Sequence, residues 1–447
     1  MAGVSERADR RIIWGDIMTT FNMIGTTTFD EASTGMIAAL LDGTYDLFTS
    51  SKVTVNGSGT YAGWHVYIYP VSSFTQSGSS FSGNVDHIEI YNADGVLIGT
   101  VTDIDPGVSY GSLNLLSPNS SEYLITIYGS AGADIIHALP DGQAIDGGEG
   151  NDQLIGSSSA DLLYGNNGSD LIQGFGGDDE LLVGGGDTVE GGLGDDYLLY
   201  EGVGGTGTFD GGAGVDILDL SYATSSINIT MGLAAPAGYM TALNMELVAG
   251  GDYNDTIYGT NGDDLLAGLG GADHLVGGAG DDLIDGGAGG DTIEGGDGID
   301  EVDYSASTVG VTVDLTITAA QNTRFGMDVL SGIENLDGTT SGDTLRGDGG
   351  ANGLKGLAGD DLLDGGAGID TMDGDIGNDA YYVDNSQDVV IDASGFDTIY
   401  ASIDYTLNAP SIETLVLIGT AVNATGNSGL DRLFGNDLDN TLTDMER

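Results

Sequence analysis

The sequence has no cysteine, only four histidines, and nine lysine and arginine residues among 447. The absence of cysteine excludes a disulfide framework and thiolate metal sites. Against the few basic residues stand 70 aspartates and glutamates, which give a formal net charge of −61, and no lysine or arginine occurs between Lys52 and Arg324. This negative field argues against nucleic acid and anionic membrane surfaces as partners.

Long apolar runs are also missing, so the sequence predicts no membrane span. The first residues, MAGVSERADRRIIWGDIMTTF, contain no apolar run of the length that a cleavable signal peptide needs. The hydrophobic content of 40% nevertheless predicts a packed interior. A chain that is both this acidic and able to fold implies a bound counter-ion.

A nonapeptide rich in glycine and aspartate occupies most of the chain. Between Gly250 and Asp303 six copies run without a gap: GGDYNDTIY, GTNGDDLLA, GLGGADHLV, GGAGDDLID, GGAGGDTIE and GGDGIDEVD. Aspartate holds the sixth place of each copy, and isoleucine, leucine or valine holds the eighth. The regular aliphatic place argues for a folded repeat and against a flexible acidic tract.

Each nonapeptide combines a glycine-rich half suited to a tight turn with a second half suited to a short strand. If strands stack in parallel coils of two nonapeptides, turns on the same edge lie eighteen residues apart. Asp255 then lies over Asp273, and Asp264 lies over Asp282, so carboxylates form two columns. Like charges at strand spacing, about 4.8 Å, require a cation between them.

Calcium is the cation that suits such columns. It takes six to eight oxygen ligands, roughly, and accepts the backbone carbonyls that a glycine-rich turn offers together with carboxylates. Zinc and copper prefer histidine or cysteine, which are scarce or absent here.

The register divides the chain into tracts. Repeat tracts are predicted at residues 129–200, 250–303 and 338–382, with terminal repeats at 426–447. Residues 201–249 contain a single copy, GGAGVDILD, followed by alternating strands, and residues 304–337 and 383–425 also alternate. We expect these inter-tract segments to interrupt or cap one stack and start the next.

Residues 1–128 differ from the rest and predict a small β-rich module. Its segment YNADGVLI is a hairpin signal. Trp64, His65, Tyr67 and Tyr69 are either a strand packed by its aromatics or a carbohydrate-binding face.

The nonapeptide resembles GGxGxDxUx, the signature of the RTX (repeats-in-toxin), or haemolysin-type calcium-binding, family, over about two thirds of the chain from Gly129 onward. The resemblance implies an all-β fold, a parallel β-roll (β-solenoid) in several stacks after the N-terminal module. It also implies that several Ca²⁺ ions are bound by the sixth-place aspartates. These are Asp134, Asp152, Asp161, Asp170, Asp179, Asp196, Asp216, Asp255, Asp264, Asp273, Asp282, Asp291, Asp300, Asp343, Asp361, Asp370 and Asp379. Asn352, Asn440 and the glycine-poor unit ALPDGQAID depart from the pattern and put their sites in doubt.

Membership of this family further implies secretion through a type I channel of a Gram-negative bacterium, by an uncleaved C-terminal signal, and folding on extracellular calcium. The location expected is therefore extracellular, including the cell surface. The closing TLTDMER is unlike a secretion tail, and the sequence leaves open whether the chain is a fragment of a longer protein.

Three classes of function are compatible with these features. We favour a secreted, non-enzymatic calcium-binding protein with a structural or adhesive role, whose partners are calcium and either a cell-surface glycan or further copies of itself. The alternative is the export and folding module of an extracellular enzyme acting on polysaccharide or lipid, with Asp86 and Glu89 as a carboxylate pair. The third, a pore-forming toxin, lacks a long apolar segment.

Enzyme motifs are weak. No H-E-x-x-H occurs, and the G-x-S-x-G match around Ser109 lies outside any α/β pattern, so Ser109 is predicted to lie in an ordinary turn. We therefore predict that the chain is not an enzyme.

Overall fold

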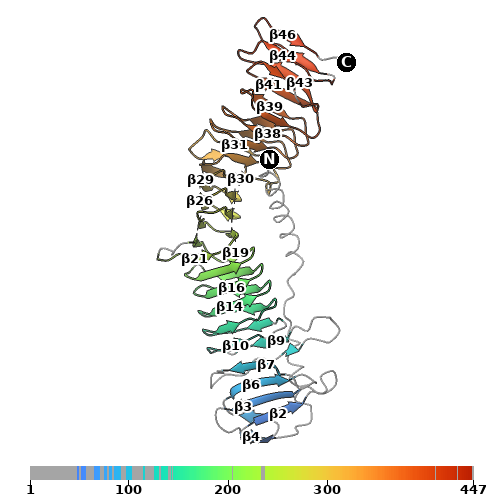
Figure 1. The fold of residues 1–447 in the computed structure, drawn as a ribbon. Helices are drawn as coiled ribbons and strands as arrows, with labels where there is room; N and C mark the ends of the chain where they lie inside the picture. Colours follow the sequence, from blue (N-terminus) through green and yellow to red (C-terminus); the bar gives the residue numbers. More distant parts are fainter. Residues whose placement is uncertain are drawn as a thin grey trace.

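The computed structural model describes residues 129–444, apart from 130–131, 139–141, 143, 204, 233–236, 408 and 430, and the backbone of the strands between Phe48 and Tyr128. The described residues form strands and turns stacked into an elongated column (Figure 1). None of them forms a helix long and apolar enough to cross a membrane. The predicted all-β parallel solenoid is confirmed.

One face of the column is a parallel sheet that we call the first sheet. Its strands, in spatial order, are β10 (Ile135–His137), β12 (Gln153–Ile155), β14 (Leu171–Gly176), β16 (Thr188–Leu193), β18 (Thr208–Ala213), β21 (Met240–Leu243), β20 (Asn228–Met231), β23 (Thr256–Tyr258), β26 (His274–Ala279), β29 (Thr292–Asp297) and β33 (Met327–Ser331).

The second sheet forms the opposite face. Its parallel strands are β9 (Ile125–Tyr128), β11 (Ala144–Asp146), β13 (Leu162–Tyr164), β15 (Glu180–Val183), β17 (Tyr197–Gly202), β19 (Ile217–Ala223), β22 (Leu247–Ala249), β24 (Leu265–Ala267), β27 (Leu283–Asp285), β30 (Glu301–Asp303), β34 (Asn335–Asp337), β36 (Gly353–Lys355), β38 (Thr371–Asp373) and β40 (Val389–Ile391).

Two further sheets complete the C-terminal part of the column. The third sheet contains β31 (Thr312–Asp314), β35 (Thr344–Arg346), β37 (Leu362–Asp364), β39 (Ala380–Val383), β41 (Asp397–Ala401), β43 (Ile412–Leu417) and β45 (Arg432–Phe434). The fourth contains β42 (Tyr405–Thr406), β44 (Asn423–Thr425) and β46 (Thr441–Thr443).

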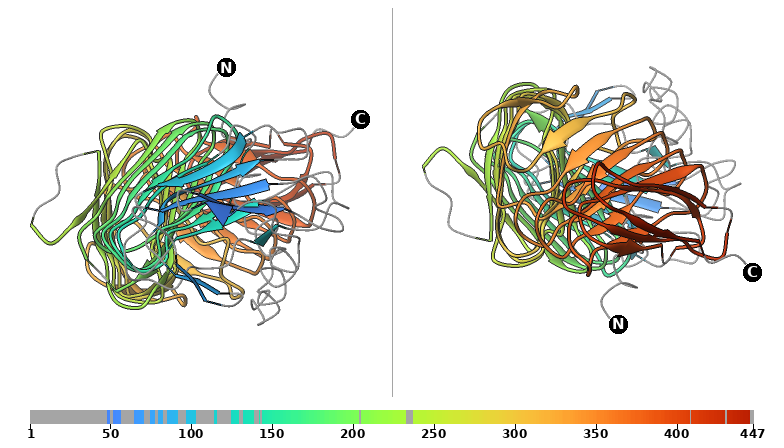
Figure 2. Two further views of the ribbon diagram at one scale, coloured as in Figure 1. Left: turned by 90° about the horizontal axis from the view of Figure 1, so that it is seen from below. Right: turned by 90° about the horizontal axis from the view of Figure 1, so that it is seen from above.

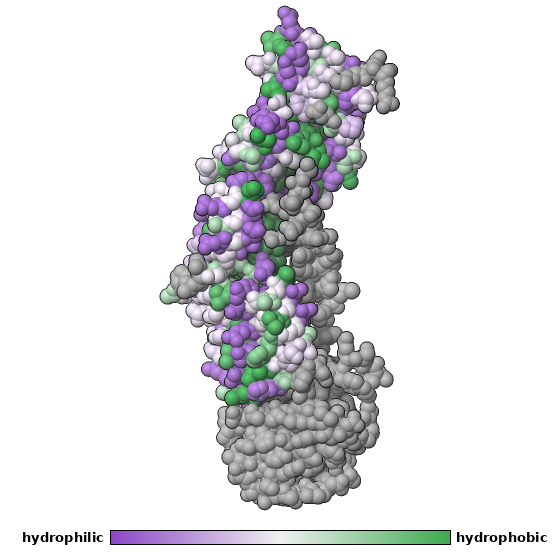
Figure 3. Space-filling model, in the orientation of Figure 1, coloured by the Kyte–Doolittle hydropathy of each residue, from purple (hydrophilic) through white to green (hydrophobic). Residues whose placement is uncertain are grey.

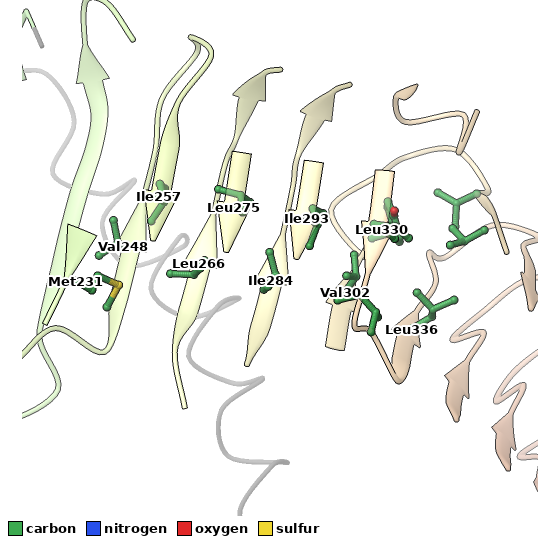
Figure 4. Packing of buried hydrophobic residues seen from close by; sticks show 14 of the residues in the cluster. Met231, Val248, Ile257, Leu266, Leu275, Ile284, Ile293, Val302, Leu330 and Leu336 are labelled. Carbon is green, nitrogen blue, oxygen red and sulfur yellow. The ribbon is translucent and has the colours of Figure 1, made fainter. Parts of the chain in front are cut away.

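The eighteen-residue register predicted for the second tract is confirmed. Ile257 pairs with Leu275 in the first sheet, and Leu266 pairs with Ile284 in the second. These eighth-place side chains point between the sheets in two facing rows (Figure 4), and each of the four is 0% exposed. Hydrophilic side chains occur along the outer surface of the column (Figure 3). The repeat therefore buries one aliphatic side chain per nonapeptide, which is the main apolar contribution to the stack.

The inter-tract segments 201–249 and 304–337 share one construction. Each segment contains two strands whose order along the chain is the reverse of their order in the stack. The second strand along the chain (β21 or β33) pairs with the preceding part of the stack. The first strand (β20 or β31) pairs with the following part. β20 and β21 also pair with each other, so the first sheet continues. In the segment 304–337, by contrast, β33 is the last parallel strand of the first sheet and β31 is the first strand of the third sheet. On this face of the column the third sheet therefore replaces the first.

The second sheet runs from β30 through β34 to β36 without a break at this changeover. Residues 304–337 therefore interrupt one face of the stack, and the opposite face continues. The reverse happens later, where the second sheet ends at β40 and the fourth begins at β42 while the third continues from β39 through β41 to β43. Seen along the column, the orange and red turns are displaced to one side of the green and yellow ones (Figure 2).

The N-terminal strands join the column directly. β1 (Phe48–Thr49), β2 (Lys52–Asn56), β3 (His65–Pro70), β6 (Val85–Tyr91) and β7 (Leu97–Thr102) form an antiparallel meander, and β7 pairs with β10 of the first sheet. The predicted hairpin at YNADGVLI is confirmed as the β6–β7 pair. Trp64 and Ser109 lie outside the described residues, as do the side chains of His65, Tyr67, Tyr69, Asp86 and Glu89.

Candidate metal centre

Every predicted ligand is a buried aspartate placed directly before a strand. All seventeen, from Asp134 to Asp379, are at most 4% exposed. The strand's eighth-place residue turns into the core, so the sixth-place side chain two residues earlier also turns inward, at the edge where the turn begins. The repeat thus places a carboxylate at the rim of the hydrophobic interior once per nonapeptide.

One oxygen of each carboxylate that follows another in the stack links successive turns. The backbone N–H of Asp255 donates a hydrogen bond to Oδ1 of Asp273 at 2.7 Å, and the N–H of Asp264 donates to Oδ1 of Asp282 at 2.8 Å. The two carboxylate columns predicted for this tract are therefore confirmed, and their members are in direct contact through the backbone.

The same bond defines six columns along the described chain. In the first sheet they are Asp134–Asp152–Asp170–Asp187 and Asp255–Asp273–Asp291–Asp328; in the second, Asp161–Asp179–Asp196–Asp216–Glu246, Asp264–Asp282–Asp300–Glu334 and Asn352–Asp370–Asp388; in the third, Asp343–Asp361–Asp379–Asp397–Glu413.

The second oxygen of the inner aspartates has no partner. Oδ2 is buried and without a hydrogen bond in Asp152, Asp170, Asp179, Asp196, Asp216, Asp273, Asp282, Asp291, Asp300, Asp361, Asp370 and Asp379. A buried, unpaired carboxylate oxygen is costly, because the group has lost its hydration and gained nothing in exchange. These twelve oxygens therefore mark where a cation is needed.

Backbone carbonyl oxygens lie beside the orphaned carboxylates. A Cβ atom placed on first-place Gly268 would lie 2.5 Å from Oδ2 of Asp273 and 2.6 Å from the carbonyl oxygen of Gly286, one turn further on. Position 268 must therefore be glycine, and the space beside it is lined by carboxylate and carbonyl oxygen atoms.

The aspartates that begin a column are different. Oδ2 of Asp161, Asp255, Asp264 and Asp343 accepts a backbone N–H from the second place of its own unit, at 2.5 to 2.7 Å. Each has no aspartate before it in its column. Twelve of the predicted ligands are thus inner aspartates with an unpaired oxygen, and these four are first aspartates whose Oδ2 accepts a bond from their own turn.

Burial shifts the titration of the inner carboxylates strongly. Desolvation, with a smaller contribution from neighbouring carboxylates, raises the pKa of Asp179 and of Asp273 to about 8. The same causes raise the pKa of Asp282 and of Asp361 to about 7. Without a cation these groups would hold protons near neutral pH, because burial and like charge both disfavour the ionised form.

The donor set fits calcium. The space beside each inner aspartate offers carboxylate and carbonyl oxygens, which are the ligands of a hard cation, and no described cysteine or histidine enters a column. When bound, calcium would supply positive charge between successive turns, whose oxygen atoms would coordinate it. The residues that would hold it are the twelve inner aspartates and the adjacent glycine carbonyls.

The structure adds members that the repeat pattern missed. Asp187, Asp328, Asp388 and Asp397 are buried column members. Asp388 and Asp397 stand eighteen residues after Asp370 and Asp379, so the register alone could have found them. Asp187 is hidden by the eight-residue unit VGGGDTVE and Asp328 by the inter-tract segment.

Three glutamates end columns. Glu246, Glu334 and Glu413 each accept the N–H of the preceding column aspartate, at 2.7, 2.9 and 3.0 Å. They occur in the similar sequences MEL, IENL and IETL, a signal visible in the sequence.

The side-chain amides of the two asparagines that depart from the pattern form hydrogen bonds with the surrounding protein. Asn352 Oδ1 accepts the N–H of Asp348, and its amide nitrogen donates to the Glu334 carbonyl. The amide nitrogen of Asn440 donates to Asn436 Oδ1 at 3.0 Å. Neither side chain carries a charge.

Comparison with known proteins gives one match. A family model described as the RTX calcium-binding nonapeptide repeat (4 copies) matches residues 126–141, 146–181, 155–189, 183–199, 246–275, 268–302, 330–362, 347–381 and 355–390. A search of curated proteins finds no match. The matched ranges contain sixteen of the seventeen predicted aspartates, all except Asp216, so the repeats imply calcium binding at this part of the fold.

Proposed function

Since this chain belongs to the RTX family of calcium-binding nonapeptide-repeat proteins, we propose that it is secreted, folds on binding extracellular calcium, and has a structural or adhesive role at the cell surface or in the surrounding matrix. The role proposed is non-enzymatic, and its further partner is a cell-surface glycan or other copies of the same chain.

The observation that carries the proposal is the set of buried Oδ2 atoms without a partner in the twelve inner aspartates among the predicted ligands. With a net charge of −61, such a chain resists compaction where calcium is scarce. Where calcium is abundant, the inner aspartates and glycine carbonyls bind it, and the aliphatic eighth places can pack. Because binding energy then becomes folding energy, the fold is coupled to the calcium level of the compartment. Extracellular fluid is richer in calcium than a bacterial cytoplasm, which favours folding after export.

Far-ultraviolet circular dichroism during a calcium titration tests this coupling, with chelator reversal and a magnesium control. We expect a cooperative gain of β signal in calcium and little in magnesium, because magnesium needs a smaller octahedral set and gives up its water reluctantly. A full β signal in chelator, unchanged by calcium, would overturn the proposal.

Location and role need separate measurements. Chain recovered from the culture medium of the producing cells, in a calcium-folded state, would support secretion. On a glycan array, binding without turnover supports an adhesive role, and cleavage of the glycan supports the enzyme-module alternative. Leakage from liposomes exposed to the calcium-free chain and to the calcium-loaded chain tests the pore-forming alternative.

A further inference from the structure

The nonapeptide register continues beyond Tyr382 with a change at its first place. Asp392 stands eighteen residues after first-place Gly374, and Asp397 follows in the sixth place. In the second and third tracts the first place is always glycine. Asp392 therefore adds a carboxylate at a position where those units have no side chain.

The added carboxylate meets two column members. Asp379, Asp392 and Asp397 each place one carboxylate oxygen within 4.8 Å of the other two. Asp379 and Asp397 are 1% and 0% exposed, and Asp392 is partly buried. Among the described residues, this is the one group of three or more potential metal-binding side chains at such short range.

Each of the three carboxylates is held by one oxygen and leaves the other open. Oδ1 of Asp379 accepts the N–H of Asp361 at 2.8 Å, and Oδ1 of Asp397 accepts the N–H of Asp379 at 2.8 Å. Oδ1 of Asp392 accepts the hydroxyl proton of buried Tyr381 at 3.0 Å. The Oδ2 atoms of all three are buried and without a hydrogen-bond partner.

No basic side chain offsets this charge. In the described part of the chain, no ion pair reaches Asp379, Asp392 or Asp397. Glu413 lies at the end of the same column and accepts the N–H of Asp397, which adds further negative charge. Three oriented and unpaired carboxylate oxygens in a buried setting need either protons or a cation, and a cation joins all three in their ionised form.

The cluster lies where the column changes from one sheet to the next. Asp392 directly follows β40, the last strand of the second sheet, whereas Asp379 and Asp397 belong to the third sheet at the starts of β39 and β41. The fourth sheet begins beyond this point with β42. A cation here would join the end of one sheet to the sheet that continues.

We propose that Asp392 extends the repeat position of Asp379 and Asp397 into a three-carboxylate calcium site, which binds its ion before the other repeat positions do and fixes the C-terminal part of the column. The proposal rests on the proposed calcium-dependent folding. Affinity of an oxygen site for calcium rises with the number of charged ligands. An inner turn such as that of Asp273 presents one unpaired aspartate oxygen to the first-place glycine, whereas this site presents three.

Calcium binding by isothermal titration calorimetry, with the bound ions counted by equilibrium dialysis, tests the site on the full chain. Asp392→Asn removes the added charge with little change in shape, and Asp392→Gly restores the repeat's own residue. Asp439→Asn, at an exposed position outside the columns, is the matched control for loss of one charge. In the wild type we expect one ion to bind at a calcium concentration at least about tenfold lower than the rest.

Both Asp392 variants should lose that tight phase and keep the remaining sites, and Asp439→Asn should keep it. Hydrogen exchange should show lost protection confined to strands β41 to β46, with β23 to β30 unchanged. An unchanged tight phase and ion count in Asp392→Asn would overturn the three-carboxylate site while leaving the repeat sites intact. Absence of calcium binding by the wild-type chain would instead overturn the proposed function itself.

Discussion

The backbone N–H of Asp300 donates a hydrogen bond to Oε2 of Glu334 at 2.9 Å, across 34 residues of chain. In the same column the preceding bonds span eighteen residues and end on aspartates. Glu246 and Glu413 end two other columns in the same way. A glutamate therefore receives the last backbone N–H in three of the six columns, whereas the column of Asp255 crosses the same inter-tract segment and ends on Asp328.

Replacing Glu334 by alanine should lower the stability of the calcium-loaded chain by about 1–2 kcal/mol, because the buried N–H of Asp300 loses its acceptor. Thermal unfolding and hydrogen exchange at the Asp300 amide measure the effect. Glu294→Ala is the control. Glu294 is exposed, and its carboxylate lies 3.4 Å from Nε2 of His274. Equal losses in the two variants would contradict a column-ending role.

Asp282→Ala should reduce the number of bound calcium ions and the melting temperature in calcium. The variant removes an unpaired Oδ2 and the acceptor for the Asp264 N–H, so turns on both sides of residue 282 are affected. Equilibrium dialysis against calcium gives the ion count. Asp297→Ala, at an exposed position of the same tract, should leave the count unchanged. An unchanged count in Asp282→Ala would argue against the inner aspartates as ligands.

Gly268→Ala should destabilise the second tract by about 2 kcal/mol, in the range for an overpacked interior. The new Cβ would lie 2.5 Å from Asp273 Oδ2 and 2.6 Å from the Gly286 carbonyl oxygen, so it fills the space that the cation needs. At Gly262 the nearest atom to an added Cβ is Thr260 Oγ1, at 3.6 Å. Calcium titrations of both variants should therefore show weakened binding for Gly268→Ala and ordinary binding for Gly262→Ala.

The calcium-free chain should gain β structure on acidification. Burial raises the pKa of Asp179 and Asp273 to about 8 and that of Asp216 and Asp370 to about 6, above the ordinary value of 3.8. The folded state then binds more protons than the unfolded state, so the stability linked to these groups is fully present below about pH 4 and is lost as the pH rises through about 6 to 8. Protons and calcium therefore compete for the same oxygens.

Circular dichroism of chain freed of calcium by dialysis, titrated from pH 8 to pH 5, measures this effect. A rise in β signal toward pH 5, together with weaker calcium binding there, is the expected result. A β signal that falls on acidification of the calcium-free chain would show that the folded carboxylates are not the groups whose pKa is raised.

The sequence by itself determined the repeat, its eighteen-residue coil and the burial of the eighth place. These follow from local rules: glycine permits the turns, and a strict period places Asp273 over Asp255 and Leu275 over Ile257. The seventeen predicted aspartates are all buried because each stands two residues before an eighth-place residue that turns into the core.

Only the tertiary structure decided which oxygens are free and where the sheets change over. Oδ2 is open in Asp273 but bonded to its own turn in Asp255 and Asp187, a difference set by the local path of each turn and not by the repeat pattern. The pairing of β20 with β21, and of β31 with β35 instead of β33, is a choice between neighbours that the alternating pattern does not specify. Asp392 joins Asp379 and Asp397 only because the turns stack, which brings residues thirteen and eighteen positions apart to one edge.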